Sequence, residues 1–442
     1  MKTFQRGVTA AALLLALSGC GIFKRSGAKV KVPGERIAIL ARETSVEADP
    51  ATATLPLALP TATVNDAWTQ PGGNASHSMG HVALASAINP LWQASVTGVS
   101  KETRYAAAPV VAGGALYVMD TSSTVHAFDA NTGARRWSVP FAREESKKER
   151  GAAFGGGVSV EGDRLFVTNG LGDVAALKTS DGSTIWKKTL GPPLRGAPSV
   201  ALGLVLVTSQ DNQLFALNET DGATQWSSAA AVQLAGIFGA SSPAVAQGTV
   251  VAGFSSGDLN AYRYENGRTL WQDALSRTSV NTSVGALTDI DADPVIDQGR
   301  VFAIGQGGRM VALELLTGQR VWELNIAGIS TPWVAGDWLF VVTDDARLLC
   351  VARATGKVRW VQQLVRYRNL KSRSGPISWT GPVLAGGRLI LASNTGELVQ
   401  VAPEDGKVQS TVRLRAGVSQ APVVANNTLY LLQDDGRVVA YR

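Results

Sequence analysis

Short apolar runs that alternate with polar positions recur from about residue 106 to the end of the chain. The first unit contains four such runs, at 108–113, 115–120, 124–130 and 135–140. Alternation with a period of two places every second side chain on the same face, as in a β-strand. The stretches between the runs are rich in glycine, which tolerates the positive φ of tight turns. The pattern therefore predicts units of four short strands joined by turns.

Glycine, tryptophan and proline mark the units at fixed spacings. A glycine stands four residues before a tryptophan in six units, at Gly133, Gly182, Gly222, Gly267, Gly318 and Gly356. A proline stands 24 residues before the same glycine in most units, at Pro109, Pro198, Pro243, Pro294 and Pro332, and Pro382 precedes Gly406 at the same distance. In the unit of Gly406, Ser410 occupies the tryptophan position, and an eighth unit starts at Pro422.

Repeated four-stranded units of about 40–50 residues are typical of a β-propeller. Eight unit starts predict an all-β fold, an eight-bladed β-propeller of four-stranded antiparallel blades. The eighth unit ends after three strands, and the strand at 89–96, with Trp92, precedes the first unit. We expect this N-terminal strand to complete the last blade and close the ring, since closure removes an exposed sheet edge. We expect a structural role between blades for Trp92, Trp137, Trp186, Trp226, Trp271, Trp322 and Trp360.

The N-terminus has the features of a secretory signal. Lys2 and Arg6 precede a short apolar run, and small residues lead to Cys20. The stretch "LSGC" resembles a bacterial lipobox, which implies a signal peptide over 1–19 and lipidation of Cys20. Residues 20–66 are interrupted by prolines and low in complexity, which predicts a flexible tether, and the propeller is expected over 67–442. Gly21 after the cysteine implies sorting to the outer membrane.

Charge and reactive residues argue against several functions. Removal of the signal would lower the formal net charge from +6 to +4, too little for its size to indicate nucleic-acid binding. The chain has 3 histidines, and His77 and His81 lie in a Gly-rich segment without nearby carboxylates or cysteines. The segment 289–294 begins like a calcium loop but has proline where glycine is needed. Cys350 is expected in the core. We therefore expect no catalytic residue, no metal and no cofactor.

The repeats resemble those of quinoprotein dehydrogenases, whose blades end in a similar glycine and tryptophan motif. That resemblance implies pyrroloquinoline quinone, calcium and usually a pair of adjacent cysteines. This chain has no such pair, since its 2 cysteines are far apart. A quinoprotein dehydrogenase is therefore kept as an alternative prediction, and so is a periplasmic adaptor that binds another partner in the cell envelope.

Lipobox, tether and eight blades together resemble the BamB family, the propeller lipoproteins of the bacterial outer-membrane β-barrel assembly (BAM) machinery. The resemblance implies a non-catalytic scaffold on the periplasmic face of the outer membrane. It further implies binding to the periplasmic POTRA domains of BamA, to other BAM components and to incoming unfolded outer-membrane proteins.

The resemblance also implies a BamA-binding patch on two neighbouring connections. The first, at 232–243, places Ile237 at an apolar position and Phe238 where the family has an arginine. The second carries an Asp-x-Asp pair, Asp289 and Asp291, which otherwise reads as a solvated turn. Arg195 lies in a similar motif, but one blade too early in the sequence to belong to the patch.

The connection at 365–378 is strongly basic. It is expected to be a solvated loop, or else a contact with acidic lipid headgroups or with a partner.

Overall fold

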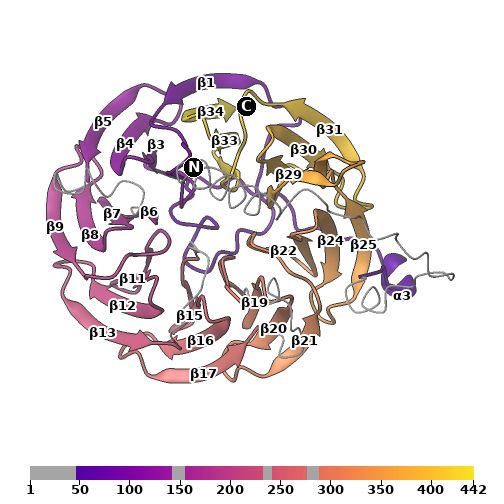
Figure 1. The fold of residues 1–442 in the computed structure, drawn as a ribbon, viewed down its shortest axis with the longest axis horizontal. Coiled ribbons are helices and arrows are strands. Elements are labelled where there is room, and N and C mark those ends of the chain that lie inside the picture. Colours follow the sequence, from indigo (N-terminus) through magenta and orange to yellow (C-terminus); the bar gives the residue numbers. More distant parts are fainter. Residues whose placement is uncertain (1–45, 142–154, 232–240, 276–287) are drawn as a thin grey trace, which may run out of the picture. The chain divides into compact units, whose positions relative to one another are not determined.

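The computed structural model describes residues 46–141, 155–231, 241–275 and 288–442. Eight four-stranded antiparallel sheets follow one another around a ring, with the first strand of each sheet innermost and the fourth on the rim (Figure 1). This confirms the predicted eight-bladed propeller.

The strands follow the predicted order within each blade. Blades 1 and 2 contain β2 (Val110–Ala112), β3 (Ala115–Met119), β4 (Thr124–Asp129), β5 (Arg135–Pro140), β6 (Gly156–Glu161), β7 (Arg164–Asn169), β8 (Asp173–Lys178) and β9 (Thr184–Thr189). Blades 3 and 4 contain β10 (Ser199–Ala201), β11 (Leu204–Thr208), β12 (Gln213–Asn218), β13 (Thr224–Ala229), β14 (Ala244–Ala246), β15 (Thr249–Gly253), β16 (Asp258–Arg263) and β17 (Thr269–Ala274).

The second half of the ring repeats the arrangement. Blades 5 and 6 contain β18 (Val295–Asp297), β19 (Arg300–Ile304), β20 (Met310–Glu314), β21 (Arg320–Leu324), β22 (Trp333–Ala335), β23 (Trp338–Val342), β24 (Arg347–Ala352) and β25 (Val358–Gln363). Blades 7 and 8 contain β28 (Trp379–Ala385), β29 (Arg388–Ser393), β30 (Glu397–Val401), β31 (Val408–Arg413), β32 (Val423–Ala425), β33 (Thr428–Leu432), β34 (Arg437–Tyr441) and β1 (Pro90–Ser95). A separate hairpin of β26 (Tyr367–Asn369) and β27 (Ser374–Pro376) stands between blades 6 and 7.

Each rim tryptophan joins its blade to the next. Trp226 lies opposite the small Ala216 across β12 and β13, next to a bulge in the register. Its Nε1 donates a hydrogen bond of 2.7 Å to the carbonyl of Tyr264 in the following blade. Its ring covers Gly267, so closely that a Cβ there would lie 2.5 Å from the indole. The same donation to the next blade is made by Trp92, Trp137, Trp186, Trp271, Trp322 and Trp360.

The ring closes through β1, as predicted. β1 pairs antiparallel with β34, so the N-terminal strand is the fourth strand of blade 8. Beyond the ladder, Asn89 and Arg442 exchange two backbone hydrogen bonds of 2.9 Å. Trp92 lies opposite Ala440 and donates to the carbonyl of Ala130 in blade 1.

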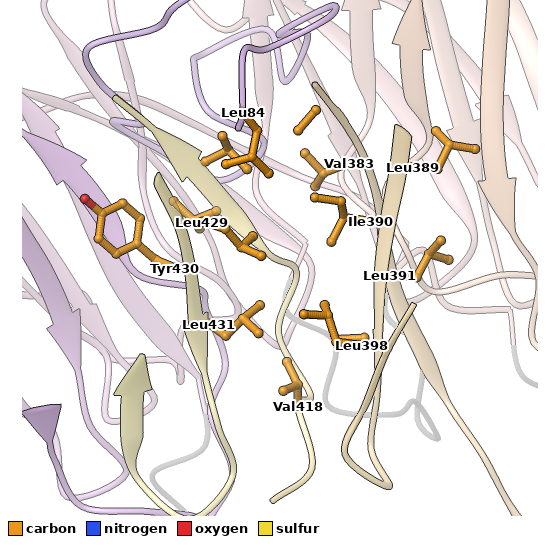
Figure 2. Close-up of a cluster of buried hydrophobic side chains, with 14 of the residues drawn as sticks. Leu84, Val383, Leu389, Ile390, Leu391, Leu398, Val418, Leu429, Tyr430 and Leu431 are labelled. Carbon is orange, nitrogen blue, oxygen red and sulfur yellow. The ribbon is translucent and has the colours of Figure 1, made fainter. Parts of the chain in front are cut away.

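Blade 7, which has Ser410 in place of a tryptophan, packs differently at its rim. Every residue of β31 is exposed, and Ser410 lies opposite Gln400 where most blades have alanine. A groove of about 580 Å³ lies beside it, lined in part by Ile88 and Val412. Deeper in, leucine, isoleucine and valine side chains of blades 7 and 8 remain in contact (Figure 2).

The absent tryptophan has a structural reason. Blade 8 is completed by a strand from the other end of the chain, so no continuous third-to-fourth-strand turn exists there to receive an indole.

A segment N-terminal to β1, residues 63–84, contacts the innermost strand of every blade. Trp68 exchanges two backbone hydrogen bonds with Val111, and Thr69 accepts from Val160. Further contacts join Asn65 to Val424 and Asn426, Gln70 to Val200, Ala75 to Val245, Ser76 to Ile296, Gly80 to Trp333 and Val82 to Leu384 and Gly386. We call residues 63–84 the central cap.

Residues 46–62, expected in the tether, also contact the propeller. The short helix α3 (Pro50–Ala53) begins at Asp49, whose side chain accepts the amide of Thr52. The amide of Asp49 donates 2.8 Å to Val358 at the start of β25. Residues 46–442 form one compact unit, which extends upstream of the expected boundary at 67.

Candidate partner-binding site

The connection between blades 2 and 3 carries an arginine into the interior. Arg195 follows β9 and precedes β10, and its backbone amide donates 2.8 Å to Thr208 while its carbonyl accepts from Gly156. These two bonds fix its main chain between neighbouring blades. Its side chain is 0% exposed, so the guanidinium must find its partners inside the protein.

Those partners come from the connection into blade 5. Nη2 of Arg195 donates 2.7 Å to Oδ1 of Asp289, 3.2 Å to the carbonyl of Ile290 and 3.4 Å to Oδ1 of Asp291. Arg195 therefore spans from the start of blade 3 to the start of blade 5. By sequence order Arg195 lies one blade too early to belong to the predicted BamA-binding patch. The signal in the sequence that could link it to Asp289 and Asp291 is its opposite charge.

The connection that carries Asp289, Ile290, Asp291 and Asp293, which we call the aspartate loop, is held by further hydrogen bonds to neighbouring blades. The amide of Ile290 donates to Phe254, and Gln306 donates through its backbone to Asp289 and through Nε2, at 2.5 Å, to Oδ2 of Asp291. On the far side, Asp293 accepts the amide of Ser242 at 2.7 Å. The loop is thus a fixed element and not a free turn.

The two aspartates differ in exposure. The side chain of Asp289 is 1% exposed, whereas that of Asp291 is 13% exposed. Burial, and then the neighbouring Asp289 carboxylate, raise the pKa of Asp291 to about 7. Of the pair, only Asp291 can present an oxygen to another molecule.

Three polar atoms of this ion pair find no hydrogen-bond partner among the residues that the structure describes. They are Nε and Nη1 of Arg195 and Oδ2 of Asp289, all buried. Unpaired buried polar atoms are costly, so the site is less stable than a fully satisfied network would be.

Ile237 and Phe238, the two other predicted contact residues, lie outside the described residues, as does Cys20. The described chain ends at Ala231 and resumes at Ser241, whose side chain donates to Ala292 of the aspartate loop. The first predicted connection therefore meets the second at its described C-terminal end.

No set of three or more His, Cys, Asp or Glu residues within the described ranges is arranged to hold a metal ion. Nδ1 of His77 lies 2.7 Å from the carbonyl of Pro294, and Nδ1 of His81 lies 2.7 Å from that of Pro60. Cys350 is buried opposite Trp360, and burial raises the pKa of its thiol.

Eight blades in a closed ring, seven of which are joined to the next blade through a rim tryptophan, define the class: a closed propeller of the kind also found in quinoprotein dehydrogenases. The quinohemoprotein alcohol dehydrogenase of Comamonas testosteroni superposes with a TM-score of 0.67 at 14% identity, over 86% of this chain and 81% of that one. At this identity the likeness concerns the fold alone.

Sequence comparison gives the family. The chain belongs to the family of the outer membrane protein assembly factor BamB, whose model matches residues 78–149, 121–362 and 365–442. The BamB of Salmonella typhimurium is 33% identical over 352 residues, 79% of this chain and 88% of the relative. That of Escherichia coli K12 is 34% identical over 333 residues, 75% of this chain and 82% of the relative.

A solved structure of the same family agrees in fold. BamB from Moraxella catarrhalis superposes with a TM-score of 0.68 at 17% identity, covering 80% of this chain and all of that one. Separately, none of the helices in the described part of the chain is long and apolar enough to cross a membrane.

Proposed function

We propose that this protein is a non-catalytic scaffold of outer-membrane protein assembly, acting on the periplasmic face of the outer membrane. The observation that carries the proposal is its membership of the BamB family across nearly the whole propeller. The partners proposed are the POTRA domains of BamA, other BAM components and unfolded barrel proteins on their way to insertion.

The docking surface we propose is the aspartate loop together with the connection that holds Ile237 and Phe238. In this arrangement the two aspartates have separate roles. Asp289 neutralises Arg195 in the interior, and Asp291 offers its partly exposed carboxylate to the partner. Arg195 acts as a positioning residue that fixes the loop from two blades away.

The test separates these roles. Asp291→Asn keeps the shape of the loop and leaves the shorter Arg195–Asp289 bond in place. We expect it to weaken binding to the purified POTRA domains of BamA about tenfold, as measured by calorimetry. Reversing Asp289 would instead leave two cations buried together and unfold the site.

The matched control is Asp273→Asn, which removes a carboxylate that pairs with Arg320 on the rim of blade 4. It is expected to bind normally. Equal affinity of Asp291→Asn and the unchanged protein, with both folded by circular dichroism, would remove Asp291 from the docking surface.

The lipid anchor is proposed at Cys20. Cys20→Ser is expected to move the protein from the membrane fraction to the soluble periplasmic fraction. Mass spectrometry of the mature N-terminus of the unchanged protein would show the acyl chains, and an unmodified N-terminus would contradict the proposal.

A further inference from the structure

The connection between blades 6 and 7 is a structured projection. β26 and β27 pair antiparallel, with Tyr367 opposite Pro376 and Asn369 opposite Ser374, and belong to no blade. We call residues 365–376 the basic hairpin. Its base is fixed, because Ile377 donates its amide 2.9 Å to Arg366.

The core anchors that base. Ile377 is 6% and Trp379 5% exposed, and both belong to the largest apolar cluster. Nε1 of Trp379 donates 2.9 Å to the carbonyl of Val365. The hairpin therefore projects from a rigid support.

The tip is a tight turn with an apolar side chain in solvent. Oδ1 of Asn369 accepts the amides of Lys371 and Ser372, both at 3.1 Å. Arg373 adopts a φ of 51°, in the left-handed region. Leu370 is left 70% exposed, the most exposed large apolar side chain in the described ranges.

The hairpin is cationic throughout. It carries Arg366, Arg368, Lys371 and Arg373 and no acidic residue. All four are exposed, and none forms an ion pair with a described residue. Arg366, at the base, interacts electrostatically with Asp345. The three cations nearer the exposed leucine, Arg368, Lys371 and Arg373, have no acidic residue beside them in the hairpin, which is unusual for a solvated loop because ordinary protein surfaces mix both signs of charge.

A groove adjoins the hairpin on the side of blade 7. Its volume is about 380 Å³, and its lining includes Val365, Ile377, Arg368 and Arg413. Arg413 also lies 3.6 Å from Glu397. Glu397 also lines the groove, which thus combines apolar side chains with two arginines and one carboxylate. The apolar side chains next to Arg368 suit a phosphate that carries an apolar tail.

The N-terminal segment joins the propeller on the same strand. Asp49 bonds to Val358 at the start of β25, and the hairpin follows the end of β25. Cys20, the proposed site of the lipid anchor, stands 26 residues before Val46 in the sequence. An anchor at Cys20 would thus keep this rim of the propeller near a bilayer.

We propose that the basic hairpin is a membrane-binding site for anionic phospholipids. Its cations contact headgroup phosphates, and Leu370 enters the interface between headgroups and acyl chains. Charge complementarity points to an anionic surface, and the exposed leucine favours a bilayer over an acidic protein. The proposal goes beyond the scaffold function and depends on neither Asp291 nor BamA.

The experiment is vesicle flotation with residues 20–442 carrying Cys20→Ser, so that neither the signal segment nor a lipid anchor contributes. The vesicles contain phosphatidylethanolamine with phosphatidylglycerol, or phosphatidylcholine alone. We expect binding to the anionic vesicles only, weakening with salt. The triple variant Arg368→Ser, Lys371→Ser, Arg373→Ser should lower the partition coefficient about 100-fold, and Leu370→Ser roughly tenfold.

The control is Lys101→Ser, Lys178→Ser, Arg268→Ser, which removes three exposed cations elsewhere. It should float like the parent. Equal flotation of the two triple variants would overturn the proposal. It would also be overturned if the parent failed to bind anionic vesicles, which is the result expected if the hairpin binds only an acidic protein. Unchanged melting temperatures would show that the hairpin variants fold.

Discussion

At the scale of single residues, each rim indole closes two gaps at once. It donates to a carbonyl of the next blade and covers the glycine of that blade's turn. Glycine is required there twice over, because the backbone has positive φ and because the indole leaves no space for a Cβ. Most units therefore carry one glycine that receives the indole of the preceding blade and one tryptophan that packs on the next blade.

Gly267→Ala tests the contact against a matched glycine. Gly267 (φ 69°) and Gly299 (φ 78°) share the left-handed conformation, but only Gly267 lies against an indole, while Gly299 faces open space. Both substitutions cost about 1–2 kcal/mol for the backbone. Gly267→Ala should cost a further 1–3 kcal/mol or so for the clash with Trp226. Thermal unfolding of both variants checks this, and equal melting temperatures would contradict it.

Asp291 predicts how stability depends on pH. Its pKa of about 7 in the folded protein exceeds the ordinary 3.8, so the folded state holds an extra proton between these values. The free energy of unfolding should therefore fall as pH rises from about 4 to about 7. Asp291→Asn removes this penalty, so its melting temperature should rise relative to the parent between pH 4 and pH 8.

The control for this titration is Asp163→Asn, at a carboxylate whose side chain is 93% exposed. Its melting temperature should follow the parent at every pH. If the difference between Asp291→Asn and the parent stays constant from pH 4 to pH 8, the carboxyl does not titrate in this range.

Residue predictions from the sequence succeeded where the repeat supplied a template. Six tryptophan positions are predictable because six units share the glycine–tryptophan spacing, and Trp92 follows from the count of strands in the last blade. Arg195 was missed because its partners Asp289 and Asp291 stand two blades away, a contact that ring geometry creates and no local pattern reveals.

At the scale of elements, β1 decides whether the ring closes. Replacing residues 89–96 by a Gly/Ser sequence of the same length keeps the central cap connected to blade 1. It removes the pairing with β34 and the rim tryptophan Trp92. We expect an aggregating or poorly folded protein, because the edge of blade 8 is exposed. Light scattering and thermal unfolding measure this, and a monomer that melts like the parent would show that closure is dispensable.

The strands of the blades could be predicted from alternation and turn residues, but other elements could not. The basic hairpin lacks apolar alternation, since its strands are three residues each and almost wholly exposed. The central cap forms no regular element, and its main-chain bonds to the blades reach strands from 43 residues (Trp68 to Val111) to 302 residues (Val82 to Leu384) away. A period in the sequence predicts which side chains share a face of one element, and it gives no information on pairing between distant segments.

At the scale of the whole molecule, the central cap connects all eight blades. Trp68 is 3% exposed and stacks on Trp333 of blade 6 while its backbone pairs with blade 1. Trp68→Ala should cost about 3–5 kcal/mol. Hydrogen exchange should quicken at Val160, Val245 and Ile296, whose amides donate to the cap. If hydrogen exchange quickened at Val111 alone, the loss of Trp68 would affect only blade 1 and the cap would not connect the other blades.

The pairing of β1 with β34 also sets an order of events during biosynthesis. The strand of Trp92 leaves the ribosome, and crosses any membrane, before all eight blades have been made, and its partner Arg437–Tyr441 comes last. Until then β1 is an unpaired edge that must be kept from other strands. A chain truncated before β34 never acquires that partner, so only a chain that has been synthesised through β34 can close the ring.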